Sequence, residues 1–368
     1  MKTRGMEAAS AYTRRLPQGC KHCRRGTKLV LLVTGKCSSG CFYCPLSEKK
    51  QGQGQVYADE LLAKSDEDVL LEARLIGAKG TGITGGDPLD VLDSVVHYIA
   101  LLKGAFGPEH HIHLYTATIE GKAYRRLQVA GLDELRVHPS VRSWNKMESS
   151  GLKEAVEDLE MDVGLEVPSI PGEDGATETL IRFADRIGLD FVNLNELEFS
   201  ETNCVQLKKR GFEAKDDASA AAQGSEALAL KLLELDVKIP IHYCSSSFKD
   251  SVQLRNRLRR RAKHTARPGD VITDDGTLVK GVIEGTDLAL AERILREEFQ
   301  VPRKLIHVDE QKNRLEIAPW VLQELSTRLP FECYIVEEYP TADRLEVERE
   351  RLGHEQAKSA KAKKLKGI

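Results

Sequence analysis

The sequence has few aromatic residues and no long apolar run. Aromatic side chains make up 5% of its 368 residues. No apolar stretch approaches the roughly 18–20 residues that a membrane-spanning helix needs. The amino-terminal segment, residues 1–19, is basic and holds no apolar core of the kind found in secretory signal peptides. We therefore expect neither a membrane span nor secretion.

Cysteine and net charge are also low. Eight cysteines in 368 residues are too few for the disulfide framework of a small secreted protein. The formal net charge is −3, so charge as a whole gives no reason to expect nucleic acid as a partner. The composition is that of an ordinary globular chain, long enough for one barrel-sized domain and a smaller one.

Three of the cysteines lie close together in the stretch CSSGCFYC. Cys37, Cys41 and Cys44 have the spacing C-x3-C-x2-C. They closely follow an apolar run, residues 29–33, that is typical of a buried strand. The sequence thus predicts a cysteine loop at the carboxyl end of a strand, where α/β folds bind their ligands.

The spacing of the three cysteines limits what they can hold. Thiolates favour zinc, Cu(I) or an iron–sulfur cluster. A structural zinc site usually takes paired cysteines from two places in the chain, whereas here three share one loop and no fourth cysteine or histidine follows closely. A disulfide between two of them would leave the third unpaired. A 4Fe–4S cluster on three cysteines keeps one iron open. The spacing favours such a cluster, with zinc as the alternative.

The motif C-x3-C-x-aromatic-C, with Tyr43 directly before Cys44, is similar to the signature of radical S-adenosylmethionine (SAM) enzymes. The chain resembles microbial members related to pyruvate formate-lyase activating enzyme. The resemblance implies that Cys37, Cys41 and Cys44 hold a 4Fe–4S cluster whose free iron binds SAM. It implies reductive cleavage of SAM to a 5′-deoxyadenosyl radical, which abstracts hydrogen from a substrate. An electron donor such as flavodoxin or ferredoxin and a cytoplasmic location are then expected, because the cluster is labile.

Apolar strands and amphipathic helices alternate along the rest of the chain. Six or seven strand–helix repeats imply right-handed crossovers and a parallel sheet. We expect an α/β fold, which the resemblance implies is a partial TIM-like (β/α)6 barrel, with a seventh strand as an addition. The predicted strands are residues 29–33, 80–84, 111–115, 134–138, 162–167, 191–197 and 237–243, and the predicted helices are residues 66–76, 89–102, 122–130, 152–159, 177–187, 225–235 and 251–264.

A glycine-rich segment follows the second predicted strand. Gly85, Gly86 and Asp87 stand before Pro88. They are similar to the GGEP motif that binds the amino group of SAM in the radical SAM family, with aspartate in place of glutamate. An ordinary strand-to-helix turn is the alternative for such a segment. Tyr43, inside the cysteine motif, is expected to help place SAM as well.

Three residues at the later strands complete the expected SAM site. Ile170 lies in a Pro/Gly loop that resembles the loop packing on adenine, with a plain turn as the alternative. Glu166 is expected to bind the ribose of SAM or to pair with a neighbouring basic side chain. Asn195 is polar within an apolar strand, so it needs a partner and is expected to line the cavity.

Other cysteines and two histidines suggest further chemistry. Cys20 and Cys23 form a C-x2-C pair, which is half of a metal site. Cys244 is a candidate third ligand of this auxiliary metal, and inert thiols are the alternative. His111 and His113 alternate along the third predicted strand and so share one face. They are expected to be structural, or one of them to face the cavity.

The carboxyl-terminal part divides from the barrel at Pro268 and Gly269. Just before this point, residues 255–267 hold seven basic side chains, which suit either phosphate contacts or a solvated helix face paired with acids. The domains expected are a basic and irregular extension with the C-x2-C pair at residues 1–27, a radical SAM barrel at 28–267, a small α+β substrate-recognition domain at 268–344, and a charged tail at 345–368 that is a fraying helix or disordered.

The sequence therefore predicts a radical SAM enzyme whose substrate, and the residues that act on it, are unidentified. Two alternatives remain at this point. One is a radical SAM enzyme that modifies RNA, since the arginine-rich stretch and the lysine-rich end suit a polyanion. The other is a zinc-stabilised binding module without enzymatic activity, since thiolates also select zinc.

Overall fold

The computed structural model describes residues 3–216 and 219–353. It divides into two compact units between Arg257 and Leu258. This point lies within helix α10 (Arg255–Thr265), ahead of the linker expected at residues 268–269. No helix among the described residues is both long enough and apolar enough to cross a bilayer.

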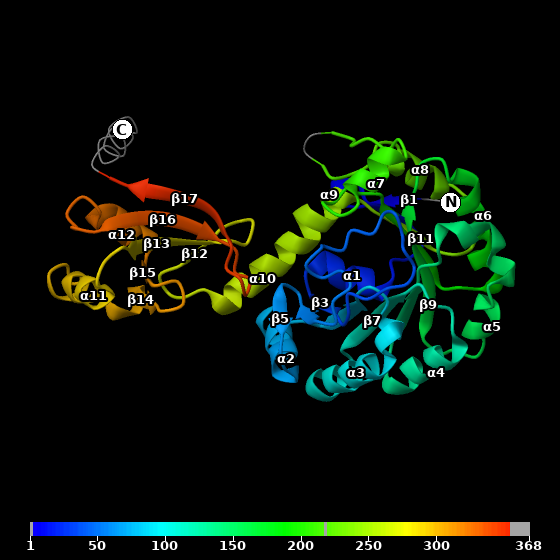
Figure 1. Ribbon diagram of the computed structural model, residues 1–368, viewed down its shortest axis with the longest axis horizontal. Coiled ribbons are helices and arrows are strands. Elements are labelled where there is room, and N and C mark those ends of the chain that lie inside the picture. The colour runs from blue at the N-terminus through cyan, green and yellow to red at the C-terminus, as the bar shows by residue number, and fades with distance from the viewer. Residues whose placement is uncertain (1–2, 217–218, 354–368) are drawn as a thin grey trace. The chain divides into compact units, whose positions relative to one another are not determined.

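The first unit is built on a sheet of seven neighbouring parallel strands, wrapped on its outer side by helices (Figure 1). The first six predicted strands are confirmed, and the seventh, predicted at residues 237–243, is a shorter strand, Ile241–Cys244, that runs parallel to its neighbour. In spatial order they are β3 (Lys28–Leu32), β6 (Gly80–Thr84), β7 (His111–Thr116), β8 (Glu134–Val137), β9 (Asp162–Ser169), β10 (Phe191–Glu196) and β11 (Ile241–Cys244).

One helix of this unit begins at a cap that the sequence predicts. Ser65 accepts from the Asp68 amide and the Asp68 carboxylate accepts from the Ser65 amide, so a capping box starts α2. The helices are α2 (Asp66–Leu75), α3 (Leu92–Phe106), α4 (Gly121–Ala130), α5 (Leu152–Val156), α6 (Asp174–Ile187), α7 (Cys204–Lys209), α8 (Ser225–Leu232) and α9 (Ser246–Phe248), with the 3-10 helices η1 (Glu7–Ala9), η2 (Pro88–Val91) and η3 (Val141–Ser149) and the π-helix η4 (Lys249–Leu254).

The two faces of the parallel sheet differ in chemistry. On one face, Leu114 and Leu135 join the apolar core that also includes buried side chains of the surrounding helices. The other face carries Arg136, Glu166 and Asn193, which are hydrogen-bonded to one another. This second face of the sheet is therefore lined by hydrogen-bonded polar side chains rather than by an apolar core.

The prediction that residues 1–27 are irregular is wrong. Strand β1 (Thr3–Gly5) pairs with β2 (Ala11–Thr13), and β2 pairs antiparallel with β11 at one edge of the sheet. Helix α1 (Gln18–Arg25) then packs on β3, β6 and β7. At the other edge, the hairpin of β4 (Val56–Ala58) and β5 (Leu61–Ala63) pairs with β3.

The second unit holds α10 from Leu258 onward and an antiparallel sheet with helices α11 (Leu288–Glu297) and α12 (Pro319–Leu325). Its apolar face and these helices form a separate core that includes Leu295, Ile317 and Leu322. The strands, in spatial order, are β14 (Ile306–Asp309), β15 (Arg314–Ile317), β13 (Leu278–Glu284), β16 (Glu332–Glu338) and β17 (Glu346–Leu352), with β12 (Val271–Ile272) paired to β13 and the 3-10 helix η5 (Arg303–Leu305) before β14.

Strand β17 corrects the prediction of a charged tail at residues 345–368. Residues 346–352 pair with β16 along its length, because their alternating charged side chains find partners across the strands. Arg351 donates to Glu332, and Arg349 donates to Glu284. The rest of the expected tail, residues 354–368, lies outside the described residues.

Candidate functional site

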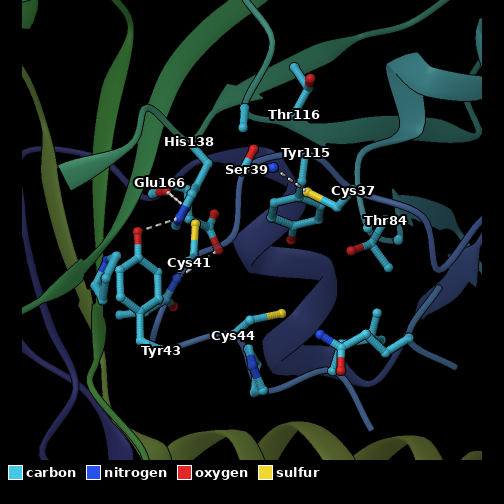
Figure 2. A pocket seen from close by; sticks show the side chains of 18 of the residues that line it. Cys37, Ser39, Cys41, Tyr43, Cys44, Thr84, Tyr115, Thr116, His138 and Glu166 are labelled. Carbon is cyan, nitrogen blue, oxygen red and sulfur yellow. Dashed lines mark hydrogen bonds between the residues drawn. The ribbon is translucent and has the colours of Figure 1, made fainter. Parts of the chain in front are cut away.

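The three cysteines of the loop after β3 line one cavity of about 480 Å³ (Figure 2). The cavity lies at the carboxyl ends of the parallel strands, which is the edge where the sequence places it. Residues at or directly after the ends of β6 to β10 form its wall, namely Thr84, Thr116, His138, Pro168 and Asn195.

The thiols of Cys37, Cys41 and Cys44 turn toward a common space in Figure 2. All three are free, with Cys37 exposed and the other two half-buried. Burial raises the pKa of Cys41, and negative charge on the other two thiols would raise it further. A bound cation reverses this effect, because a coordinating metal holds thiols as thiolates. The donor set therefore fits a soft metal centre with space left for one more ligand.

Gly86 lets the turn after β6 lie directly against the cysteine loop. Its amide donates to the carbonyl of Thr34 at 2.7 Å, and the amide of Asp87 donates to the carbonyl of Lys36 at 2.8 Å. A Cβ atom on Gly86 would overlap that carbonyl of Lys36. Only glycine allows so close an approach of two backbones. Gly85 and Gly86 both line the cavity.

Tyr43 joins the cysteine loop to the sheet. Its hydroxyl lies 3.0 Å from Nε2 of His138, and Nδ1 of that ring donates to the backbone carbonyl of Glu166 at 2.6 Å. Burial lowers the pKa of His138, so the ring is neutral. Since Nδ1 carries the proton, Nε2 accepts and the hydroxyl of Tyr43 donates. Burial raises the pKa of Tyr43 and keeps this donor protonated.

Glu166 is held as a carboxylate at the cavity wall. Burial alone would raise its pKa, but Arg136 and the amides of Asn193 and Asn195 outweigh burial, and the pKa is lowered. Arg136 donates to Oε2 of Glu166 at 2.5 Å, and Asn195 donates to Oε1 at 3.0 Å. The pairing with a basic neighbour expected from the sequence is thus present, and Glu166 and Asn195 line the same cavity as the cysteines.

Two of the predicted SAM residues lie outside the cavity wall. The carboxylate of Asp87 is buried and accepts hydrogen bonds from both side chain and amide of Thr118, from the Thr116 hydroxyl, and from the amides of Ala117 and Leu89. It therefore joins the turns after β6 and β7. Ile170 is fully buried in the apolar core, directly after β9.

The structure also brings in residues that the sequence analysis did not single out. His138 directly follows a strand, so inspection of strand ends would have found it. Lys249 lines the cavity and its Nζ lies 2.8 Å from Glu198. The side chain of Asn203 donates a hydrogen bond to the backbone carbonyl of Tyr43 in the cysteine loop, and no sequence motif identifies this residue.

The thiols of Cys20, Cys23 and Cys244 are all buried inside the first unit. Cys20 accepts from Arg136 and Asn193 at 3.4 Å each, and Cys244 accepts from Gln253 at 3.3 Å. Burial raises the pKa of Cys20 and raises that of Cys244 to about 12. The thiols of Cys20 and Cys244 are therefore protonated, which opposes metal binding unless an ion itself supplies the compensating charge.

A family model described as a domain of unknown function, DUF8061, matches residues 276–352, within the second unit. Two solved structures of the FeFe-hydrogenase maturase HydG resemble the chain at TM-scores of 0.37 and 0.36. The first, from Carboxydothermus hydrogenoformans, is 15% identical, with 50% of this chain and 49% of that chain covered. The second is 17% identical over 49% and 47%.

A relative from Methanocaldococcus jannaschii matches nearly the whole chain. It is described as "Putative glycyl-radical enzyme activating enzyme" and is 41% identical over 357 residues, covering 91% of this chain and 92% of its own length. This coverage is larger than either unit alone, so the match extends over both units. The chain therefore belongs to the radical SAM enzymes, in the branch related to pyruvate formate-lyase activating enzyme.

Proposed function

We propose that Cys37, Cys41 and Cys44 hold a 4Fe–4S cluster and that SAM binds in the adjoining cavity. The observation that carries this proposal is the convergence of three free thiols on one cavity that glycine and polar side chains also line. A cluster held by these thiols would supply the single electron for reductive cleavage of SAM to methionine and the 5′-deoxyadenosyl radical, which would abstract hydrogen from the substrate.

The chain's own residues bind and position in this scheme. The three thiols supply the charge that the cluster needs, and Gly85 and Gly86 leave backbone room for the amino acid part of SAM. Glu166, an ionised carboxylate in the wall, suits the ribose hydroxyls as acceptors of their hydrogen bonds. Asn195 holds that carboxylate in place. The electron comes from a donor protein such as flavodoxin or ferredoxin.

We infer that the parallel sheet is the partial TIM-like barrel of this family. Six successive β/α repeats and a seventh strand support this inference, as does the consecutive spatial order of the strands. The second unit is proposed as a substrate-recognition domain. It has its own core and its own family model, which suits an added recognition module.

The substrate is proposed to be a glycine of a partner protein. The description of the M. jannaschii relative as an activator of a glycyl-radical enzyme supports this proposal. The alternative of an RNA substrate has less support. Two arginines of the basic stretch make contacts within the protein itself. Arg257 forms an ion pair with Asp59 at 2.8 Å, and Arg261 donates a hydrogen bond to the carbonyl of Pro340.

Anaerobic reconstitution with iron and sulfide tests the cluster and the cleavage of SAM together. We expect a brown protein with about four irons per chain that forms 5′-deoxyadenosine when reduced. Cys37→Ala should lose both, whereas Cys204→Ala, a half-buried cysteine on α7, should lose neither. A colourless wild-type protein that takes up zinc on these cysteines would overturn the proposal.

The substrate is tested separately by deuterium transfer. A partner protein labelled with α-deuterated glycine should pass deuterium into 5′-deoxyadenosine, and labelled RNA should not.

Family membership excludes the non-enzymatic zinc module as an account of the whole chain. A second metal on Cys20, Cys23 and Cys244 stays a subsidiary proposal, to be tested by metal content after Cys20→Ser/Cys23→Ser.

A further inference from the structure

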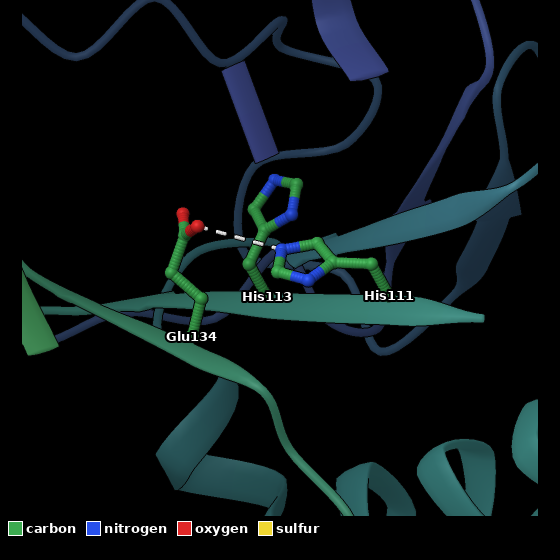
Figure 3. A group of neighbouring side chains, drawn as sticks. All are labelled: His111, His113 and Glu134. Carbon is green, nitrogen blue, oxygen red and sulfur yellow. Dashed lines mark ion pairs between the residues drawn. The ribbon is translucent and has the colours of Figure 1, made fainter. Parts of the chain in front are cut away.

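A second group of metal-binding side chains lies at the opposite end of the parallel strands from the cysteine cavity. His111 and His113 share one face of β7, and Glu134 stands on the neighbouring strand β8, paired in register with His113. Figure 3 shows the two imidazole rings and the carboxylate turned toward one another. One ligand atom from each residue lies within 4.8 Å of the other two.

Both rings present a nitrogen without a hydrogen-bond partner. Nδ1 of His113 and Nε2 of His111 are buried and make no hydrogen bond of normal geometry, and Nε2 of His111 has only an ion-pair contact with Glu134; the side chain of His113 is 0% exposed. A buried nitrogen left unpaired costs about 1–3 kcal/mol, so Nδ1 of His113 next to the loosely paired Nε2 of His111 needs an explanation. A metal ion between them would satisfy both.

The spacing of the donors suits tetrahedral coordination. Nε2 of His111 lies 3.4 Å from Oε2 of Glu134. Two ligand atoms on a tetrahedral ion with bonds of about 2.0–2.1 Å are roughly 3.3–3.4 Å apart. The remaining nitrogen of His113, Nε2, lies 3.2 Å from the hydroxyl of Tyr115. This contact is the outer hydrogen bond that orients a metal-binding histidine with its other nitrogen free.

The surrounding charges indicate which kind of ion fits. Arg136 contacts Glu134 and is shared with Glu166, and Lys28 is a second cation that acts on His113. With one ligating carboxylate and two nearby cations, Mg²⁺ or Ca²⁺ would be held poorly, because these ions depend on several oxygen ligands. A transition ion that binds through nitrogen lone pairs is favoured instead.

We propose that His111, His113 and Glu134 bind a divalent first-row transition-metal ion, and that Zn²⁺ is the ion this donor set fits best. Two imidazoles and one carboxylate form a known zinc ligand set, which leaves a fourth position for water. The site is independent of the cysteine loop and of any reaction there.

Helix α1 closes the site from the amino-terminal segment. The amide of Gly19 donates to Oε2 of Glu134 at 3.1 Å, and the ring of His22 stacks on that of His111 at 5.6 Å between centroids. A Cβ atom on Gly19 would lie 2.7 Å from Nδ1 of His113 and 2.9 Å from Oε1 of Glu134, so only glycine fits against the donors. The ion would thus fix β7 and β8, and through them the helix.

Metal content in a variant without the cluster cysteines tests the proposal. The full chain with Cys37→Ala/Cys41→Ala/Cys44→Ala is stripped with a chelator, dialysed against Zn²⁺ and assayed for zinc by mass spectrometry. We expect about one zinc per chain. Adding His113→Gln should remove it. Adding His110→Gln should leave it, because that buried neighbouring ring bonds Thr81 at 2.8 Å and is not part of the site.

Two further measurements keep the proposal falsifiable if His113→Gln does not fold. Zinc-edge X-ray absorption of the folded parent variant should show imidazole and oxygen scatterers without sulfur, and Cys20→Ser/Cys23→Ser should keep its zinc. No zinc bound by the folded parent would overturn the proposal, as would sulfur scatterers or loss of zinc with those two thiols.

Discussion

Asn203 donates its side-chain amide to the backbone carbonyl of Tyr43 at 3.1 Å, across 160 positions of sequence. The same amide donates to the carbonyl of Glu198 at 3.0 Å, while its oxygen accepts from the Ser200 amide at 2.8 Å. Thr202 adds a hydrogen bond to the carbonyl of Cys44 at 3.3 Å. The segment after β10 is therefore a rigid support for the loop that carries the three cysteines.

Replacing Asn203 with alanine should weaken cluster retention. The change removes three hydrogen bonds and leaves the buried carbonyl of Tyr43 without this donor, at a cost of about 1–3 kcal/mol. We expect the reconstituted variant to lose iron to a chelator several-fold faster than the wild type, measured by absorbance under anaerobic conditions. Asn256→Ala, at an exposed donor to the Arg24 carbonyl, is the matched control. Equal rates of iron loss would refute the role of Asn203.

Tyr43→Phe should loosen the same loop from its other side. The phenyl ring keeps the packing against Phe42 and His138 but removes the hydrogen bond to Nε2 of His138, which is worth about 1 kcal/mol. We expect roughly a threefold to tenfold faster loss of iron on exposure to air. Tyr57→Phe loses only an exposed hydrogen bond to Gln55 and should behave as wild type.

The repeating part of the fold could be predicted from the sequence, because apolar strands and capped helices carry local signals. The strand at residues 80–84 and the capping Ser65 were both found in this way. The cysteine loop and its position at the strand ends followed from the motif and from the rule for parallel sheets. These predictions needed no knowledge of distant contacts.

The amino-terminal segment could not be read in the same way. The buried residues of α1 are Gly19, Cys20, His22 and Cys23, which give no apolar stripe, because the interior that they enter is polar. Strand β17 was missed because its charged side chains are paired across the sheet instead of buried. Asp87 matched a sequence motif by its position. Its carboxylate instead accepts hydrogen bonds from Ala117 and Thr118, which follow β7 and are distant in sequence.

Asp87→Asn should destabilise the protein rather than act on SAM alone. An amide cannot accept all of the hydrogen bonds that the carboxylate accepts from Thr116, Ala117 and Thr118. We expect the free energy of unfolding to fall by about 2–4 kcal/mol, measured by urea denaturation. Asp90→Asn, exposed three residues further on, should change it little. An Asp87→Asn variant with wild-type stability and weaker SAM binding would instead support direct contact with SAM.

Glu166→Gln should weaken SAM binding while the wild type keeps its affinity at mildly acidic pH. The carboxylate has a pKa below its ordinary value of 4.5, so it stays ionised from pH 8 down to pH 5. Loss of a charged hydrogen bond costs about 1.5–3 kcal/mol, which corresponds to a rise in the dissociation constant of at least tenfold. Calorimetry of SAM binding to the reconstituted protein measures both effects. Glu160→Gln, on the exposed turn before β9, is the control.

The second unit should lose stability in acid through its buried ion pairs. Lys280 and Arg314 reach Glu338 at 2.8 and 2.6 Å. Burial alone would raise the pKa of Glu338, but these two cations and Arg344 lower it to about 2. A depressed carboxyl pKa stabilises the folded state above the unfolded value and ceases to do so as the pH falls through the folded value.

The loss is therefore expected between about pH 4.5 and pH 2, and to amount to about 3 kcal/mol from Glu338. Hydrogen exchange of the β13, β15 and β16 amides measures it within the intact chain. Glu338→Gln should be less stable at neutral pH, because Lys280 and Arg314 lose a buried charge partner, and its stability should vary less with pH. Glu348→Gln, on the exposed side of β17, should leave the pH dependence unchanged. If the stability of the wild-type protein derived from hydrogen exchange did not change between these pH values, the ionised carboxylate of Glu338 would not stabilise the second unit.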